Sequence, residues 1–205
     1  MGEDIRLDGK IAVVTGGGRG LGRAMALALV EAGANVIAAD IIGENLDQVA
    51  GEAAALANPG ANTGALAGVT ADIRQSGDCR RVVEAAHAHF GGLDILINNA
   101  GLLPSYAYPG RFLDGAEPAK FWNLSDDVVQ DVLDTNFVAH DRLTRYAVPH
   151  MIDKGWGRIV NFASLQTTRA FPGGVSYGAS KAGIAQLTRA MAEAWSGFGI
   201  NTNAI

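Results

Sequence analysis

Short runs of apolar and β-branched residues alternate with segments of helical periodicity along the whole chain. Runs such as 11–15 and 35–40 are almost entirely apolar, which is typical of strands buried on both faces. Strands separated by helices predict a parallel sheet covered by helices on both faces, and right-handed crossovers make such a sheet doubly wound. We expect strands at 11–15, 35–40, 66–72, 93–97, 157–163 and 200–205, and helices at 23–32, 44–56, 76–90, 125–152 and 175–195.

The composition is that of a globular protein. The 205 residues, 48% of them apolar, suffice for one domain with a sizeable core, and no repeat or linker divides them. A net charge of −5 without a basic cluster argues against nucleic acid as a partner. The single cysteine, Cys79, fits a reducing compartment. Neither a signal peptide nor a bilayer-spanning run is apparent, so we expect a cytoplasmic protein without membrane contact.

The segment Thr15–Gly22, Thr-Gly-Gly-Gly-Arg-Gly-Leu-Gly, joins the first predicted strand to the first predicted helix. Glycines there permit a tight turn and a close approach of the backbone to a ligand, and the helix N-terminus favours a phosphate group. In this context the segment predicts the pyrophosphate site of a dinucleotide. A plain strand–helix connection is the alternative.

Asp40 ends the second predicted strand, where an acidic residue binds the adenosine ribose hydroxyls of a dinucleotide. A carboxylate there repels the additional phosphate of NADP, which favours NAD. Arg19, inside the glycine turn, argues in the other direction because it can reach a phosphate. An acidic residue after a strand is also ordinary loop chemistry, and that alternative stays open.

Tyr177 and Lys181 are four residues apart in a predicted helix, so their side chains project from one face. A phenol has a pKa of roughly 10, and a neighbouring cation lowers that value. The pair therefore suits general acid–base chemistry on an alcohol or a ketone. The spacing by itself is typical of a solvated helix face, and Ser164 by itself is typical of a structural serine. The separation between Ser164 and Tyr177 along the sequence is what favours a joint site of the three residues.

The glycine turn, the run Asn98–Gly101, Ser164, Tyr177 and Lys181 occur in an order and spacing that closely resemble the short-chain dehydrogenase/reductase family. The resemblance covers nearly the whole chain. It implies an α/β fold, a Rossmann-type doubly wound parallel sheet in a single three-layer domain. It also implies an NAD-dependent oxidoreductase that transfers hydride to or from a small-molecule alcohol or ketone, with NADP the less favoured cofactor.

The resemblance further implies residue roles. Ser164 would polarise the substrate oxygen, Tyr177 would exchange its proton, and Lys181 would bind the nicotinamide ribose and lower the pKa of the phenol. Asn136 would hold a water in a proton relay, although a solvated helix asparagine is the alternative. The implied cofactor contacts are Thr15, Gly16, Arg19, Gly20, Leu21, Gly22, Asp40, Asp72, Ile73, Asn98, Ala100, Gly101, Tyr177 and Lys181.

Within that set, Asp72 and Ile73 match the pair that contacts the adenine. Asn98 begins the motif that stabilises the central sheet and lines the nicotinamide side. The chemistry implied needs no metal ion. His87 and His89, two residues apart on a predicted helix, face different ways and make poor joint ligands.

Two features depart from the family pattern. Residues 102–120 are rich in proline, glycine and aromatic residues and predict a long irregular loop, which we expect either to form part of the substrate rim or merely to pack at the surface. The chain also stops in the sixth predicted strand. The substrate-covering part and the last strand of the family pattern are absent from residues 1–205. We expect that the sequence is trimmed from a longer protein, and a genuine truncation is the alternative.

The substrate and the assembly are less constrained. The residues after Ser164, Gln166 among them, carry polar groups suited to hydroxyls, and the sequence is similar to sugar-acid and polyol dehydrogenases of the gluconate type. The alternatives are a 3-oxoacyl thioester reductase, against which Asp40 argues, and a non-catalytic dinucleotide-binding scaffold. The resemblance implies a homodimer or homotetramer through the helices at 125–152 and 175–196, with ordinary intramolecular packing of these helices as the alternative.

Overall fold

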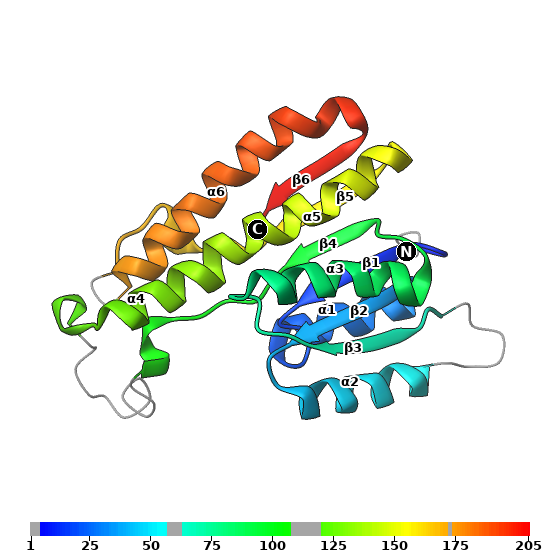
Figure 1. The fold of residues 1–205 in the computed structure, drawn as a ribbon, viewed down its shortest axis with the longest axis horizontal. Coiled ribbons are helices and arrows are strands. Elements are labelled where there is room, and N and C mark those ends of the chain that lie inside the picture. The colour runs from blue at the N-terminus through cyan, green and yellow to red at the C-terminus, as the bar shows by residue number, and fades with distance from the viewer. Residues whose placement is uncertain (1–4, 57–62, 108–119, 172–173) are drawn as a thin grey trace.

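The computed structural model describes residues 5–56, 63–107, 120–171 and 174–205, and its centre is a six-stranded parallel sheet. The strand order is β3-β2-β1-β4-β5-β6, so the direction of winding reverses between β1 and β4. Figure 1 shows β3 at one edge of the sheet and β6 at the other. The strands are β1 Ile11–Thr15, β2 Asn35–Asp40, β3 Leu66–Thr70, β4 Ile95–Asn98, β5 Gly157–Asn161 and β6 Ile200–Ala204. The predicted Rossmann-type doubly wound fold is confirmed.

Helices cover both faces of this sheet. They are α1 Gly20–Glu31, α2 Gly43–Leu56, α3 Ser76–Phe90, α4 Asp126–Leu133, α5 Ala139–Lys154 and α6 Val175–Trp195. Because side chains alternate along a strand, Val14 and Val36 pack with α1 and α2, whereas Val13 and Ile37 pack with α3 and α5. Burial on both faces explains why these strands are continuous apolar runs.

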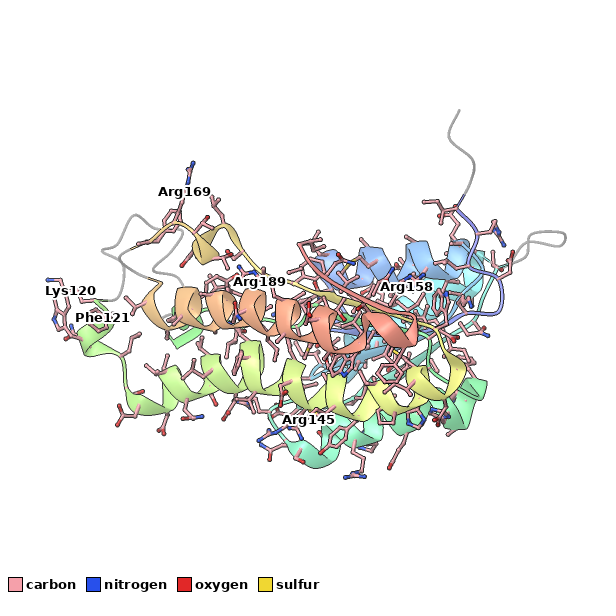
Figure 2. All side chains as sticks on the ribbon, turned by 90° about the horizontal axis from the view of Figure 1, so that it is seen from above. Lys120, Phe121, Arg145, Arg158, Arg169 and Arg189 are labelled. Atoms are coloured by element: carbon pink, nitrogen blue, oxygen red, sulfur yellow. The ribbon has the colours of Figure 1, made fainter. Side chains whose placement is uncertain are left out.

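The helix expected at 125–152 is a composite. A π-helical turn, Asp134–Val138, joins α4 to α5 without a break in the helical run. Ser125 occupies the N-cap position, as expected, but its side chain makes no capping hydrogen bond. In Figure 2 this composite helix and α6 run side by side, with Phe121 and Arg169 at the end where α6 begins.

Other boundaries differ by a few residues, and local hydrogen bonds explain two of them. The third strand stops at Thr70 because the Asp72 carboxylate accepts the Arg74 N–H at 3.1 Å and turns the chain. The first helix begins at Gly20, three residues early, because Arg23 N–H already donates to the Arg19 carbonyl. Most of the predicted 102–120 loop, residues 108–119, lies outside the described residues, and it is flanked by short 3-10 turns.

Candidate active site and adjoining pocket

A cavity of about 600 Å³ opens at the carboxyl ends of β1, β2 and β4, where the strand order reverses. This is where open α/β sheets bind ligands. Ten of the predicted cofactor residues line it: Gly16, Arg19, Gly20, Leu21, Gly22, Asp40, Asp72, Ile73, Ala100 and Gly101. The cavity is also lined by Arg74, Asn99, Leu102 and Thr135, which were not predicted from the sequence as cofactor contacts.

The glycine turn has the backbone that a phosphate cradle needs. Gly16 and Gly20 have φ values of 64° and 55°, in the left-handed region that glycine adopts at little cost. A Cβ on Gly22 would collide with the Gly16 carbonyl, so helix α1 can start this close to the turn only with glycine there. A cradle closed to side chains fits a pyrophosphate at the helix N-terminus.

Thr15 and Asn99 support this turn from beneath. Thr15 is fully buried, and its hydroxyl accepts the N–H groups of Asn99 and Ala100 at 3.1 Å each. The Asn99 side chain donates to the carbonyls of Thr15 and Gly16. Thr15 therefore holds the turn in place without lining the cavity.

Asp40 is nearly buried and lines the cavity, and its carboxylate already accepts two backbone hydrogen bonds. Oδ2 accepts the Gly18 N–H at 3.0 Å, and Oδ1 accepts the Ile42 N–H at 3.1 Å. An ionised carboxylate accepts about four hydrogen bonds, so each oxygen keeps capacity for a ligand hydroxyl. The carboxylate thus orders the glycine turn while it faces the cavity.

The predicted adenine wall is pinned by an arginine that sequence analysis did not single out. Arg74 donates to both carboxylate oxygens of Asp72 and pairs with Asp131 on α4 at 2.8 Å. The hydrogen bond from Arg74 holds the pKa of Asp72 below its ordinary value. Ile73 is buried beside them. An Asp-x-Arg spacing after a strand is the signal that could have suggested this clamp.

Asn98 lies below the cavity rather than in its wall. Its side chain is fully buried and donates to Asn161 on β5 at 2.8 Å and to Thr144 on α5 at 3.2 Å. These bonds fit the expected role of stabilising the central sheet. Its neighbour Asn99 lines the cavity, because side chains alternate at the end of β4, and a contact of Asn98 with the nicotinamide side stays a prediction.

Asn136 sits in the π-helical turn, fully buried, so the solvated alternative is wrong. Its Oδ1 accepts the Leu102 N–H at 2.7 Å, and its Nδ2 donates to the Leu102 carbonyl at 2.8 Å. Nδ2 also donates to the Ser180 hydroxyl at 3.2 Å, which uses both amide hydrogens. The side chain therefore clamps the segment after β4 to α6.

Lys181 and Tyr177 project from the first turns of α6 toward the same region. Lys181 is 2% exposed, and its ammonium donates to the Phe162 carbonyl at 2.5 Å and lies 5.8 Å from the centre of the Tyr177 ring. A Cβ on Gly101 would lie 3.8 Å from Lys181 Nζ, so the ammonium borders the cavity wall. Burial lowers the pKa of Lys181 to about 8.

Ser164 and Gln166 lie between β5 and α6. The Ser164 hydroxyl oxygen accepts the Gln166 N–H at 3.2 Å, which leaves its own hydrogen available. The Gln166 side-chain oxygen is buried against Gly174 and has no hydrogen-bond partner among the described residues. The segment exposes Leu165, at 60%, as well as the polar Thr168.

The histidines form no metal centre within the described ranges, where no three His, Cys, Asp or Glu side chains gather suitably for an ion. His87 packs against His150 with ring centres 3.9 Å apart. Burial lowers the pKa of His87. Among the described helices, none combines the length and the hydropathy that a membrane span requires.

A family model described as short chain dehydrogenase matches residues 10–205. The chain belongs to the short-chain dehydrogenase family. Members of this family use NAD(H) or NADP(H), and the protein is accordingly a nicotinamide-dependent oxidoreductase acting on CH–OH groups. The glycine cradle and the cavity are consistent with a dinucleotide of that kind.

Three known proteins illustrate the relationship. The chain is 36% identical to 2-dehydro-3-deoxy-D-gluconate 5-dehydrogenase of Escherichia coli, covering 97% of this chain and 71% of the relative. It is 32% identical to a 3-oxoacyl-(acyl-carrier-protein) reductase of Thermotoga maritima, covering 98% and 74%. The crystal structure of a putative short-chain alcohol dehydrogenase from Sinorhizobium meliloti matches with a TM-score of 0.84 at 31% identity, covering 98% and 73%.

Proposed function

We propose that this short-chain dehydrogenase interconverts a secondary alcohol and a ketone on a sugar acid or polyol, with NAD as cofactor. The observation that carries the proposal is the buried Lys181 ammonium, which borders the cavity at Gly101 and lies near the Tyr177 ring. A buried cation between a dinucleotide-sized cavity and a phenol provides what proton exchange at a carbon–oxygen bond requires.

The chemistry divides between the cofactor and the chain. The nicotinamide supplies or accepts the hydride when bound. In oxidation, the Tyr177 phenolate takes the proton of the substrate hydroxyl, and in reduction the phenol returns it to the oxygen. Ser164 donates its free hydroxyl hydrogen to the same oxygen. Lys181 would stabilise the phenolate and would hydrogen-bond the nicotinamide ribose of a bound cofactor.

Asn136 would serve this site as an anchor, because both of its amide hydrogens bind protein groups. A relay water would therefore have to bind something other than those amide hydrogens. The other implied cofactor contacts keep their assigned places in the proposal: the glycine turn for the pyrophosphate and Asp72 with Ile73 for the adenine.

NAD rather than NADP is supported by Asp40. Its carboxylate faces the cavity while it holds Gly18, so that an added 2′-phosphate would meet a negative charge that cannot turn away. Arg19, exposed at the start of α1, is the cation that would favour NADP. We weigh Asp40 more heavily because hydrogen bonds fix its position.

A 3-oxoacyl thioester reductase is the second candidate, and one observation favours it. Large apolar side chains are exposed on the segment after β4 and between β5 and the start of α6, among them Leu103, Leu165, Phe171 and Val175, each at least 44% exposed. Such a rim suits an acyl chain better than a polyol. The sugar-acid proposal is supported by the Escherichia coli relative, whose name states that substrate class.

The deciding experiment offers the chain NAD and NADP with a panel of sugar acids, polyols and 3-hydroxyacyl thioesters, and follows formation of the reduced cofactor. We expect turnover with NAD and a sugar acid or polyol, and its loss in Tyr177→Phe with NADH binding retained. Turnover confined to acyl thioesters would favour the second candidate. Binding of NADH without turnover on any substrate would favour a non-catalytic scaffold.

Assembly and location belong to the same proposal. We propose a homodimer or homotetramer in the cytoplasm that pairs through the α4–α5 and α6 helices. In support, the outward face of α6 carries exposed small residues, including Ala179 and Ala182, which permit close approach of a second helix.

A further inference from the structure

Three polar side chains on one face of the α4–α5 helical run are fully buried. They are Asn136, His140 and Thr144, at positions i, i+4 and i+8. Each forms a hydrogen bond with the segment that ends β4 and enters the cavity wall. Their partners are, in order, Leu102, Ala100 and Asn98.

The distance between successive side chains along the helix matches the distance between their partners along the extended segment. Four helical residues advance about 6 Å, and two extended residues advance about 6.6 Å, so the three contacts stay in register while the helix runs back along the strand. The outer two contacts already have roles, because Asn136 clamps Leu102 and Thr144 binds Asn98 beneath the cavity. The middle contact, made by His140, has no part in the proposed proton transfer.

The geometry fixes the chemical state of His140. Its Nε2 lies 2.9 Å from the Ala100 carbonyl oxygen, which can only accept, so Nε2 carries the hydrogen. The Nδ1 atom has no hydrogen-bond partner within the part of the chain that the structure describes. Burial lowers the pKa of His140 to about 3, and the Lys181 charge acts in the same direction. The ring is neutral, and Lys181 is the cation of this region.

We propose that His140 is a positioning residue of the cofactor site, whose Nε2–H fixes the Ala100 carbonyl and with it the cavity wall from Ala100 to Leu102. This inference rests on the proposed use of the cavity for a nicotinamide dinucleotide. The wall matters because Gly101, at its centre, borders both Lys181 Nζ and Asn136 Oδ1. A loosened Ala100 would displace the surface that the nicotinamide ribose must meet beside Lys181.

The test compares His140→Leu, which fills the space without a donor, with His140→Gln, which keeps an N–H donor. We expect His140→Leu to bind NADH about fivefold to tenfold more weakly, as the loss of one buried hydrogen bond predicts, and His140→Gln to recover most of that loss. Hydrogen exchange of a peptide covering 99–103 should be faster in His140→Leu without cofactor and near native in His140→Gln. The matched control is His87→Leu, in the last turn of α3, which should change neither the NADH affinity nor the hydrogen exchange at 99–103.

The outcomes distinguish a failure of the proposed cofactor site from a failure of the proposed role of His140. Failure of the native chain to bind NADH or NADPH would overturn the proposed cofactor site itself. If the native chain binds NADH and His140→Leu shows the same NADH affinity and the same hydrogen exchange at 99–103, the role of His140 alone would be overturned. Equal impairment of both variants would assign His140 to packing. Normal NADH affinity in His140→Gln, with turnover abolished and a shifted pH profile, would make His140 a proton carrier and also overturn the positioning role.

Discussion

At the scale of single residues, burial of the charged Lys181 ammonium lowers the free energy of unfolding. Burial lowers the pKa of this lysine from 10.5 to about 8. Between those two pH values the unfolded chain binds more protons than the folded one, so the stability contributed by this group rises with pH through that window. Near neutral pH the folded protein bears the full cost of burying the charge.

Lys181→Met should therefore abolish turnover and yet stabilise the fold. We expect a gain of about 1–3 kcal/mol near pH 7, after the lost hydrogen bond to Phe162 is deducted, and a smaller gain as the pH approaches 10. Urea unfolding at neutral and at alkaline pH measures both. A variant destabilised equally at the two pH values would show that the hydrogen bond outweighs the buried charge.

Asp40 supports the glycine turn, and we propose that it also selects the cofactor. Asp40→Asn removes the charge and leaves one of the two backbone N–H groups, of Gly18 or Ile42, without an acceptor. The affinity ratio of NADPH to NADH should rise about tenfold or more as the charge repulsion disappears, and stability should fall by about 1–3 kcal/mol. Titration with each reduced cofactor and urea unfolding give the two numbers. An unchanged ratio would place the selectivity elsewhere, for instance at Arg19.

Residue identities could be predicted where a position has one chemical solution. Gly22 and Asp40 are examples, because a side chain on the first would collide with the turn and the second ends a strand at the cavity. That Asn99 lines the cavity could not be predicted, since it depends on the residue at which β4 ends. Only half of the Arg74 clamp could have been predicted, because Asp72 is two residues away whereas the second partner, Asp131, is distant in the sequence.

At the scale of elements, the glycine turn and helix α1 depend on one close contact. Gly22→Ala would bring a methyl group into the Gly16 carbonyl, so it should separate α1 from the turn, weaken NADH binding at least about tenfold and destabilise the fold by about 1–3 kcal/mol. Thermal unfolding and NADH titration test this. Gly51→Ala in α2 is the matched control, because its added methyl meets no atom and helix propensity should stabilise the fold by about 0.5–1 kcal/mol. Parallel behaviour of the two variants would contradict the steric explanation.

Element order was predictable from the alternation of apolar runs and helices, but the π-helical turn at Asp134–Val138 was not. A single widened turn leaves the helical periodicity of the sequence intact, and only the contacts on either side reveal its effect. Those contacts bring Asn136 onto Leu102 and Ser180, from two elements that the sequence does not show to be neighbours. The same limitation hid the His140 contact, since a histidine in a helix has no pattern that marks it as buried.

At the scale of the whole molecule, the α4–α5 run and α6 lie side by side along the β5–β6 end of the sheet (Figures 1 and 2). The inward face of α6 is occupied by Ser180, Ile184, Thr188 and Met191, which are buried in the single chain. Its outward face presents Ala179, Ala182 and Gln186. The small side chains of Ala179 and Ala182, in the first half of α6, would let another helix pack closely there.

If this face joins two copies of the chain, a long charged side chain at its centre should separate them. Ala182→Arg should convert the native dimer or tetramer to a smaller species in light scattering coupled to gel filtration, with NADH binding retained because the neighbouring Lys181 stays buried inside the single chain. Arg81→Ala on α3, outside the helices proposed to pair, is a suitable control, since its ion pair with Asp78 is largely exposed and contributes little. A native chain that is monomeric, or an Ala182→Arg variant with unchanged mass, would assign α6 to intramolecular packing alone. The site would then have to form within one copy of the chain, because every contact described around Lys181, Asn136 and His140 is already intramolecular.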